Sequence, residues 1–226
     1  MDRPDPPPHL SPPRALDRPT MKTFLTADWH IGEERFELMQ RPFRTVAEYI
    51  DALVAHHNAA VMPNDLVYVN GDVLYQKASP EVYLPHVARF HGRKILLRGN
   101  HDRPFTDAQF APYFERIVPE GEGIDVTIAG VPCFITHYPS RAREDRFNLV
   151  GHIHSAWKFQ LNSLNVGVDV HHFRPVAEEQ IPFFLEAIES FYDLDVWTAY
   201  QPANQAHFAT RGKKSTYFEP KGSTPA

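Results

Sequence analysis

Five short blocks of residues carry the side chains that could perform chemistry. In chain order they are Asp28-Trp29-His30, Gly71-Asp72, Gly99-Asn100-His101-Asp102, His137 and Gly151-His152-Ile153-His154. Together they offer carboxylate, amide and imidazole ligands without a thiolate, a set that suits Mn, Fe, Co, Ni or Zn better than Ca or a thiolate zinc site. A carboxylate such as Asp72 can bridge two ions about 3.5–4 Å apart, the separation used in binuclear phosphoester hydrolysis. The residue types therefore predict a two-metal site.

Each block directly follows a short apolar run that has the composition of a buried strand. The five runs are Lys22–Ala27, Leu66–Asn70, Lys94–Arg98, Cys133–Thr136 and Phe147–Val150, and a sixth follows at Leu164–Val168. Open α/β sheets bind their ligands at the carboxyl ends of the strands. The glycines in the blocks let the backbone turn sharply and approach a bound ion. We therefore expect the blocks to meet at one edge of the fold.

Three helices are predicted between and after these strands. Thr45 and Glu48 form a capping box before an apolar face that includes Ile50 and His57. A second helix is expected to start at Ser79-Pro80, and a third spans Val176–Ser190 although Pro182 lies inside it. Strand–helix–strand order at the front gives way to consecutive strands after residue 120. This order predicts an α/β fold with a parallel front half and a more antiparallel back half.

Length and composition set limits on the class of protein. The chain has 226 residues, 13 His, one Cys, and 23 Lys and Arg against 28 Asp and Glu, a net charge of −5. The length fits one domain, and the charge argues against a general polyanion-binding protein. One Cys forms no internal disulfide and no N-terminal apolar segment is present, so we expect a cytoplasmic protein. No run reaches the roughly 20 apolar residues of a membrane span.

The two ends differ from the middle of the chain. Residues 1–20 hold seven of the 21 prolines and no apolar periodicity, which predicts a disordered, Pro-rich leader, and Met21 is a second candidate start. Residues 202–226 form a predicted flexible, polar tail with four bases and one acid. Because the leader is neutral, the predicted domain, residues 21–201, carries a charge of −8.

The series of blocks resembles the calcineurin-like metallophosphoesterase superfamily, in particular its compact, single-domain bacterial and phage-type branch. The resemblance runs from about residue 22 to 176 and includes Asn165-Val166-Gly167-Val168-Asp169. It implies a four-layer αββα sandwich of two mixed sheets flanked by helices. It also implies that one ion is held by Asp28, His30, Asp72 and His154, and the other by Asp72, Asn100, His137 and His152. The proline leader, the basic tail and Pro182 depart from the family pattern.

The resemblance also implies a mechanism. Two divalent ions, manganese by first choice and Fe, Ni, Co or Zn otherwise, would lower the pKa of a shared water and neutralise phosphate charge. His101 is the expected proton donor to the leaving oxygen, and Asp102 is expected to orient its ring. These roles predict hydrolysis of phosphodiester or phosphomonoester bonds in small or flexible substrates such as nucleotides and cyclic nucleotides.

Two other functions stay open at this level. A nuclease for single-stranded or short DNA or RNA ends is one. The acidic domain does not favour the basic groove that a nuclease would use, and the 34 residues between Asp102 and His137 are too few for a large cap. A non-catalytic scaffold is the other, although a scaffold has no reason to keep all seven ligands and His101. Nucleic acid is thus expected as a substrate only, no membrane partner is expected, and the oligomeric state is open.

Several further side chains have both a functional and a structural interpretation. Arg103 and Arg141 could clamp phosphate oxygens. For Arg141, which follows His137, the alternative is an exposed position in a solvated loop. Trp29 and His57 are expected to be packed structural residues. Cys133, inside a strand, is expected to be a small buried hydrophobe.

Overall fold

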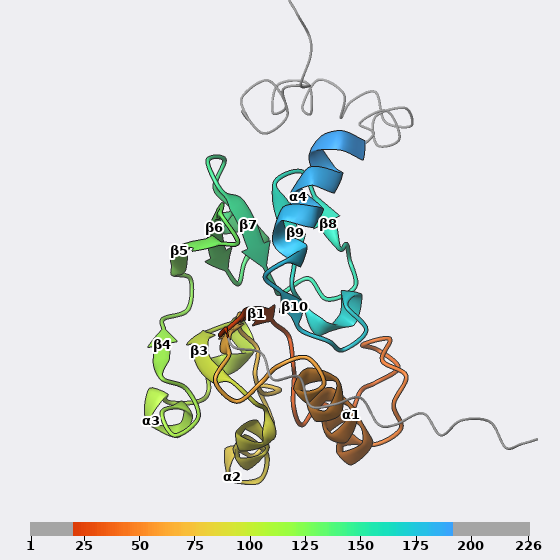
Figure 1. Cartoon of the computed structure of the whole chain (residues 1–226). Helices are drawn as coiled ribbons and strands as arrows, with labels where there is room; N and C mark the ends of the chain where they lie inside the picture. Colours follow the sequence, from red (N-terminus) through yellow and green to blue (C-terminus); the bar gives the residue numbers. More distant parts are fainter. Residues whose placement is uncertain (1–19, 192–226) are drawn as a thin grey trace, which may run out of the picture.

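The computed structural model describes residues 20–191 (Figure 1). Apart from Thr20, the predicted leader lies outside the described residues. The predicted tail and residues 192–201 of the predicted domain also lie outside them.

Two five-stranded mixed sheets form the centre of the molecule. The first has the order β10-β1-β2-β3-β4, with β1 Thr23–Thr26, β2 Leu66–Val69, β3 Arg93–Leu97, β4 Arg116–Val118 and β10 Val176–Ala177. Strands β1 to β4 are parallel and β10 is antiparallel to β1. The second has the order β5-β6-β7-β9-β8, with β5 Gly123–Ile128, β6 Val131–Thr136, β7 Phe147–Val150, β8 Phe159–Gln160 and β9 Ser163–Asn165.

The second sheet has more antiparallel pairing than the first, as predicted, but this pairing is confined to its edges. Its central strands β6, β7 and β9 pair in parallel, and only the edge strands β5 and β8 are antiparallel. The chain crosses over between β6 and β7 through residues 137–146 instead of making a hairpin. Strand β7 is buried along its whole length, as expected for a parallel strand covered on both faces.

Helices cover the sheets from both sides. The α-helices are α1 Val46–Asn58, α2 Pro80–Tyr83, α3 Asp107–Phe110 and α4 Gln180–Phe191, and short 3₁₀ helices span Leu84–Arg89, Asn100–Asp102, Pro139–Arg141 and Val168–Val170. Figure 1 shows α1, α2 and α3 below the first sheet and α4 beside the second. None of the helices within residues 20–191 has both the length and the apolar character needed to cross a bilayer.

The helix ends follow from local chemistry. The Thr45 hydroxyl accepts the Glu48 N–H at 3.1 Å, as the predicted capping box requires, but the Glu48 carboxylate accepts the N–H of Arg44, the residue before the cap, at 2.9 Å. The last helix starts later than predicted because Val176–Ala177 pair with β1. Pro182 then falls in its first turn, where a missing N–H costs no intrahelical hydrogen bond.

Two hydrophobic clusters hold the layers together. Phe24 of β1 packs with Ile50 and Leu53 of α1, in the cluster between the first sheet and its helices. The next residue, Leu25, points to the opposite face and packs with Ile135 and Leu149 of the second sheet. The second cluster also takes in Ile181, Phe184 and Ile188 of α4. The observed arrangement confirms the expected α/β sandwich of two mixed sheets flanked by helices.

His57 is packed in this core, as predicted, and makes stability dependent on pH. Burial lowers the pKa of His57 to about 4, and its Nε2 lies 3.0 Å from the His91 carbonyl oxygen. In the unfolded chain His57 has the ordinary pKa of about 6.5. The stability that the neutral, buried His57 ring provides is therefore fully present above pH ~6.5 and is lost as the pH falls toward ~4. Between pH ~6.5 and ~4 the unfolding free energy of the wild type should fall as the pH is lowered. His57→Gln keeps an N–H donor for the His91 carbonyl and should make this fall smaller by up to about 1.4 kcal/mol per pH unit.

Denaturant titrations of the wild type and His57→Gln at neutral and mildly acidic pH measure this difference. His172→Asn is the matched control because the His172 side chain is exposed. An unchanged pH dependence in His57→Gln would contradict the assignment.

Candidate metal centre

The predicted ligands lie at the carboxyl ends of strands from both sheets. Asp28 and His30 follow β1, Asp72 follows β2, and Asn100 follows β3. From the second sheet, His137 follows β6 and the pair His152 and His154 follows β7. A parallel bridge between Ala27 and Gly167 joins the ends of the two sheets. The structure therefore brings all seven predicted ligands to one edge of the sandwich.

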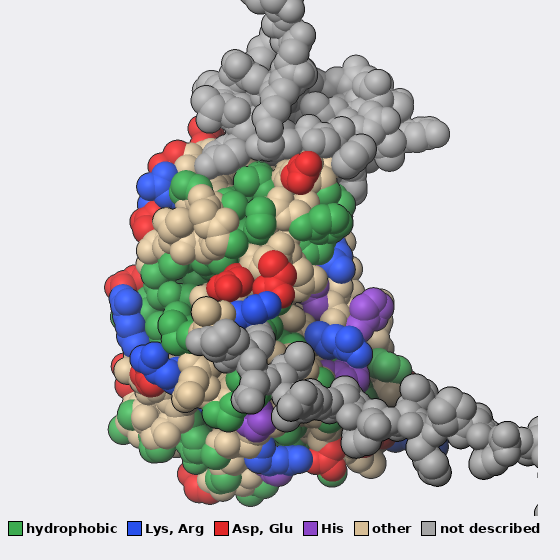
Figure 2. All heavy atoms as spheres, viewed as in Figure 1, with side chains coloured by type: hydrophobic (Ala, Val, Ile, Leu, Met, Phe, Trp, Pro, Cys, Tyr) green, Lys and Arg blue, Asp and Glu red, His purple; other side chains and the backbone are tan. Residues whose placement is uncertain are grey.

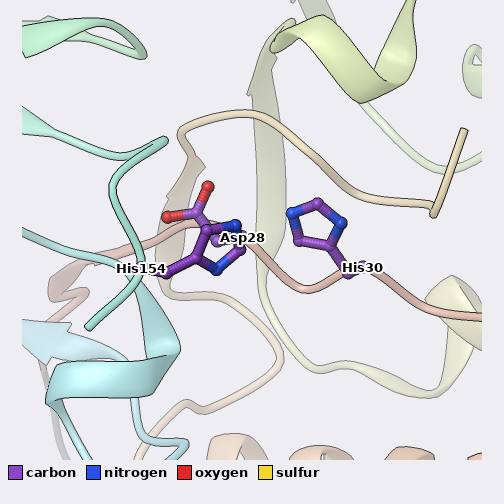
Figure 3. Close-up of side chains that lie close together, drawn as sticks. All are labelled: Asp28, His30 and His154. Carbon is purple, nitrogen blue, oxygen red and sulfur yellow. The ribbon is translucent and has the colours of Figure 1, made fainter. Parts of the chain in front are cut away.

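One cluster consists of Asp28, His30 and His154. One ligand atom from each side chain lies within 4.8 Å of the other two. Figure 3 shows Asp28 and His30 on the segment after β1, and the His154 ring arriving beside them from a different part of the chain. Asp28 and His30 are buried and His154 is half-buried.

A second cluster consists of Asp72, His137 and His152, again with one ligand atom of each within 4.8 Å of the others. The side-chain oxygen of Asn100 lies 2.8 Å from His152 Nδ1 and 3.3 Å from His137 Nε2. His152 is exposed, so this cluster opens to solvent. In the space-filling view, histidine atoms come to the surface close to Lys and Arg atoms (Figure 2).

Asp72 lies between the two clusters. Its Oδ2 is 3.4 Å from His30 Nε2 and 3.5 Å from His137 Nε2. Its Oδ1 accepts the backbone N–H of His101 at 2.8 Å. One carboxylate oxygen is thus directed at a ring nitrogen from each cluster, which is the position of a bridging ligand.

The ring nitrogens of the histidines fit metal binding. Both nitrogens of His30 are buried and have no hydrogen-bond partner among residues 20–191. His137 Nδ1 lies 2.8 Å from the Asn70 carbonyl oxygen, which fixes the proton on Nδ1 and leaves Nε2 free toward Asp72. A buried ring without partners is costly unless an ion binds it, so these residues fit divalent cations.

The charges in the cluster depend on one another. Burial raises the pKa of Asp28 to about 6, and a bound cation would favour its ionised form. Burial also acts to raise the pKa of Asp72, but the nearby His137 and His30 rings outweigh it and lower the pKa. Burial lowers the pKa of His30 to about 4, so this ring is neutral and able to bind a metal at pH 7.

The backbone at the site is strained. Five of the seven predicted ligands have left-handed φ angles: Asp28 (60°), His30 (45°), Asp72 (57°), His152 (75°) and His154 (49°). Such conformations cost non-glycine residues about 1–2 kcal/mol each. Strained backbone conformations are found most often at functional sites, where a side chain must point in a particular direction.

Comparison with known proteins identifies the family. A model of the calcineurin-like phosphoesterase family matches residues 21–195. The chain belongs to this family. Among solved structures, the chain is similar to a protein of unknown function from Aquifex aeolicus, with a TM-score of 0.59 and 19% identity over 73% of this chain and 100% of the other. That similarity supports the fold alone. None of the curated proteins matches the chain.

In this calcineurin-like phosphoesterase, His101 lies beside the first cluster. Its ring is half-buried, with its centroid 4.4 Å from that of His30. Its Nδ1 is 3.4 Å from the Gln76 backbone nitrogen, which is a long contact. The ring therefore reaches the site, where one of its nitrogens lies within 4.8 Å of ligand atoms of His30 and Asp72.

The structure gives the Asp102 carboxylate partners other than the His101 ring that it was expected to orient. The Asp102 carboxylate is fully buried and accepts backbone N–H groups of Asp72 (2.8 Å), Val73 (2.9 Å) and Gly99 (2.9 Å). It joins the loop after β2 to the loop after β3. Asp102 thus positions the Asp72 backbone, because a carboxylate already bonded to three N–H groups in the core has little capacity left for a ring.

The two arginines expected to bind substrate lie at the rim. Arg103 makes two hydrogen bonds, of 2.6 and 2.5 Å, to the Glu120 carboxylate, which also accepts the Tyr138 hydroxyl. The Tyr138 ring lies 4.9 Å from the His152 ring. Arg141 is exposed at the end of a 3₁₀ helix. Arg103 is therefore engaged by a carboxylate and is not a free phosphate clamp.

Three further buried side chains have structural contacts. Trp29 is fully buried, stacks on Phe90 at 4.3 Å and donates to the Thr26 hydroxyl. Cys133 is buried in β6, which raises the pKa of its thiol to about 12. His171 is also buried, with Nε2 2.7 Å from the Asn165 carbonyl oxygen.

Three supporting residues were assigned no role from the sequence. Asn70 holds the Thr136 and Leu149 carbonyls at 2.9 and 3.1 Å and so ties the two sheets together. Arg41 and Asp169 contact the first cluster from behind. Asp169 had a usable signal, since it follows the last strand-like run as the ligands follow theirs, whereas Arg41 lies in a polar loop that has no motif.

Gly99 lies so close to the second cluster that there is no space for a side chain at this position. A Cβ at this position would overlap Asp72 Oδ1 and lie 2.7 Å from His137 Nε2. We expect Gly99→Ala to displace both ligands and to reduce metal affinity and activity by about 10–100-fold. Equilibrium dialysis with Mn²⁺ measures the loss.

Gly130→Asn is the control. Gly130 has a φ of +83° in the hairpin between β5 and β6, and nothing lies within 4 Å of its added Cβ. Asn tolerates this conformation. Equal metal binding by the two variants would contradict the close packing at Gly99.

Proposed function

We propose that this chain is a binuclear metal-dependent phosphoesterase that hydrolyses phosphodiester or phosphomonoester bonds of small or flexible substrates, with manganese as its preferred metal. The observation that carries the proposal is Asp72, whose Oδ2 faces His30 at 3.4 Å and His137 at 3.5 Å. Family membership supports a phosphoester hydrolase. Two of the three groups of close His and Asp side chains, Asp28–His30–His154 and Asp72–His137–His152, support two ions.

The roles of the residues follow from their positions. Asp28, His30, Asp72 and His154 would hold one ion, and Asp72, Asn100, His137 and His152 the other. The bound ions would supply an acidified water and neutralise charge on the phosphate. His101 would donate a proton to the leaving oxygen, a contribution of about 10²–10⁴-fold to the rate.

Several features support a small or flexible substrate. The chain between Asp102 and His137 forms α3 and strands β4, β5 and β6, and therefore adds no separate capping domain. At the rim, the Arg103 side chain is paired with Glu120. Long polyanions need an extended basic surface, which the acidic domain does not offer.

The single Cys133, which is buried, supports a reducing cytoplasm as the proposed location.

A metal-reconstituted substrate screen tests the function. Protein stripped with chelator and reloaded with Mn²⁺, Ni²⁺ or Zn²⁺ is assayed on five substrate types: an aryl phosphomonoester, the matching bis-aryl diester, 2′,3′- and 3′,5′-cyclic nucleotides, and single-stranded DNA. A preference for the diester over the monoester by more than about tenfold, or the reverse, assigns the class. Preference for DNA would establish the nuclease instead. Inactivity on all substrates with every metal would overturn the proposal in favour of a scaffold.

A further inference from the structure

Arg41 and Asp169 form a buried ion pair directly behind the first cluster. We propose that this pair is a positioning device that sets the affinity of the Asp28–His30–His154 site and leaves the Asn100–His137–His152 site unchanged. The inference rests on the proposed binuclear centre.

The contacts between the pair and the ligand His154 are short and enclosed. Arg41 Nε donates to Asp169 Oδ1 at 2.7 Å, and Arg41 Nη2 donates to Oδ2 at 3.0 Å. Asp169 Oδ2 lies 2.7 Å from His154 Nδ1. The Arg41 and Asp169 side chains are 0% and 4% exposed. Since a carboxylate only accepts, it fixes the proton on His154 Nδ1 and frees Nε2 for a metal.

Arg41 also binds the backbone that carries the other two ligands. Its Nη2 donates to the Asp28 carbonyl at 2.7 Å, and its Nη1 donates to the Trp29 carbonyl at 3.1 Å and to the Tyr49 hydroxyl at 2.8 Å. With the two bonds to Asp169, all five N–H donors of the guanidinium are used. The Asp28 and His30 backbones have left-handed φ angles of 60° and 45°, so they need such support.

The pair thus joins ligands from the two sheets. Asp28 and His30 follow β1 of the first sheet, and His154 follows β7 of the second. Figure 3 shows these three side chains converging from separate segments. Arg41 fixes the first segment and, through Asp169, the second, which sets the distance between their ligand atoms.

The second cluster has side-chain supports of its own, and its link to the first cluster is the His152 backbone N–H, which donates to the Asp28 carboxylate at 3.0 and 3.1 Å. His137 Nδ1 pairs with the Asn70 carbonyl, and His152 Nδ1 lies against the Asn100 side chain. The hydrogen bonds and ion pairs of Arg41 and Asp169 do not involve these residues. Loss of the pair should therefore act on one ion only.

A buried ion pair such as Arg41–Asp169 adds little to the stability of a folded protein. Replacing a buried ion pair by apolar residues of similar volume is often neutral or stabilising, because desolvating two charges is costly. The forked geometry of arginine, which reaches Asp169 and two backbone carbonyls together, explains why an ion pair is present here.

The test compares Mn²⁺ binding to the full chain in the wild type, Asp169→Asn and Arg41→Lys. We expect two ions in the wild type. In both variants we expect affinity at one site to be about 10–100-fold weaker and affinity at the other to be unchanged. Electron paramagnetic resonance should then change from the signal of a coupled Mn²⁺ pair to that of isolated Mn²⁺. Lys94→Met is the control, because Lys94 Nζ is enclosed by the Phe90 and Gly92 carbonyls away from the site.

The outcomes separate the inference from the proposed function. Fewer than two ions in the wild type would overturn the binuclear function itself. Two ions in the wild type, with both sites weakened equally in the variants or with neither weakened, would overturn the inference and leave the function standing. Failure of both variants to fold, or the same change of signal in Lys94→Met, would assign the pair a structural role instead.

Discussion

Asp72→Asn should bind at most one divalent ion and should lose activity by about 10³-fold or more. The carboxylate is almost fully buried, with Oδ2 3.4 Å from His30 Nε2 and 3.5 Å from His137 Nε2. A neutral amide shared between two cations loses the charge that offsets their repulsion. A loss of about 4 kcal/mol of transition-state stabilisation corresponds to about 10³-fold in rate.

Asn is the informative replacement because it preserves the fold. Its Oδ1 can still accept the His101 N–H that Asp72 Oδ1 accepts at 2.8 Å. Metal analysis after equilibrium dialysis gives the number of bound ions, and initial rates on a reactive aryl ester give the activity. Asp125→Asn is the control, since this exposed carboxylate pairs with Arg143 and Arg146 and is not part of either cluster. Two tightly held ions in Asp72→Asn would refute the bridging assignment.

His101→Ala should keep both ions but should lose turnover according to the leaving group. The ring is half-buried beside His30, with a nitrogen within 4.8 Å of ligand atoms of His30 and Asp72, and the backbone N–H of His101 donates to Asp72. Removal of a general acid costs about 10²–10⁴-fold when the leaving oxygen is a poor leaving group. An aryl oxide leaves without protonation, so the loss on an activated ester should be less than about tenfold.

Rates on a series of esters with leaving groups of increasing pKa measure this effect. In the wild type the dependence of the rate on leaving-group pKa should be shallow, and in His101→Ala it should be steep. Metal content is measured on the same samples to separate acid loss from ion loss. An equal loss on every ester, with two ions retained, would argue against the acid role.

The local parts of the fold could be predicted from the sequence because they depend on neighbouring residues. The strand-like runs were found within one or two residues at most ends, since buried strands have a recognisable composition. The cap at Thr45 was predictable because its partner, Glu48, is three residues away. Pro182 was misread as a helix interior because the start of α4 is fixed by the pairing of β10 with β1.

The sequence by itself determined the ligand types, since blocks of Asp, Asn and His after strands are local patterns that place these side chains at the carboxyl edge of a sheet. Only the tertiary structure decided how they are held. Asp102 binds N–H groups from two loops and not the adjacent His101 ring. Arg41 meets Asp169 across 128 positions of the chain. Such partners cannot be predicted from local spacing, because a hydrogen bond depends on distances of about 3 Å that arise only when the two sheets pack together.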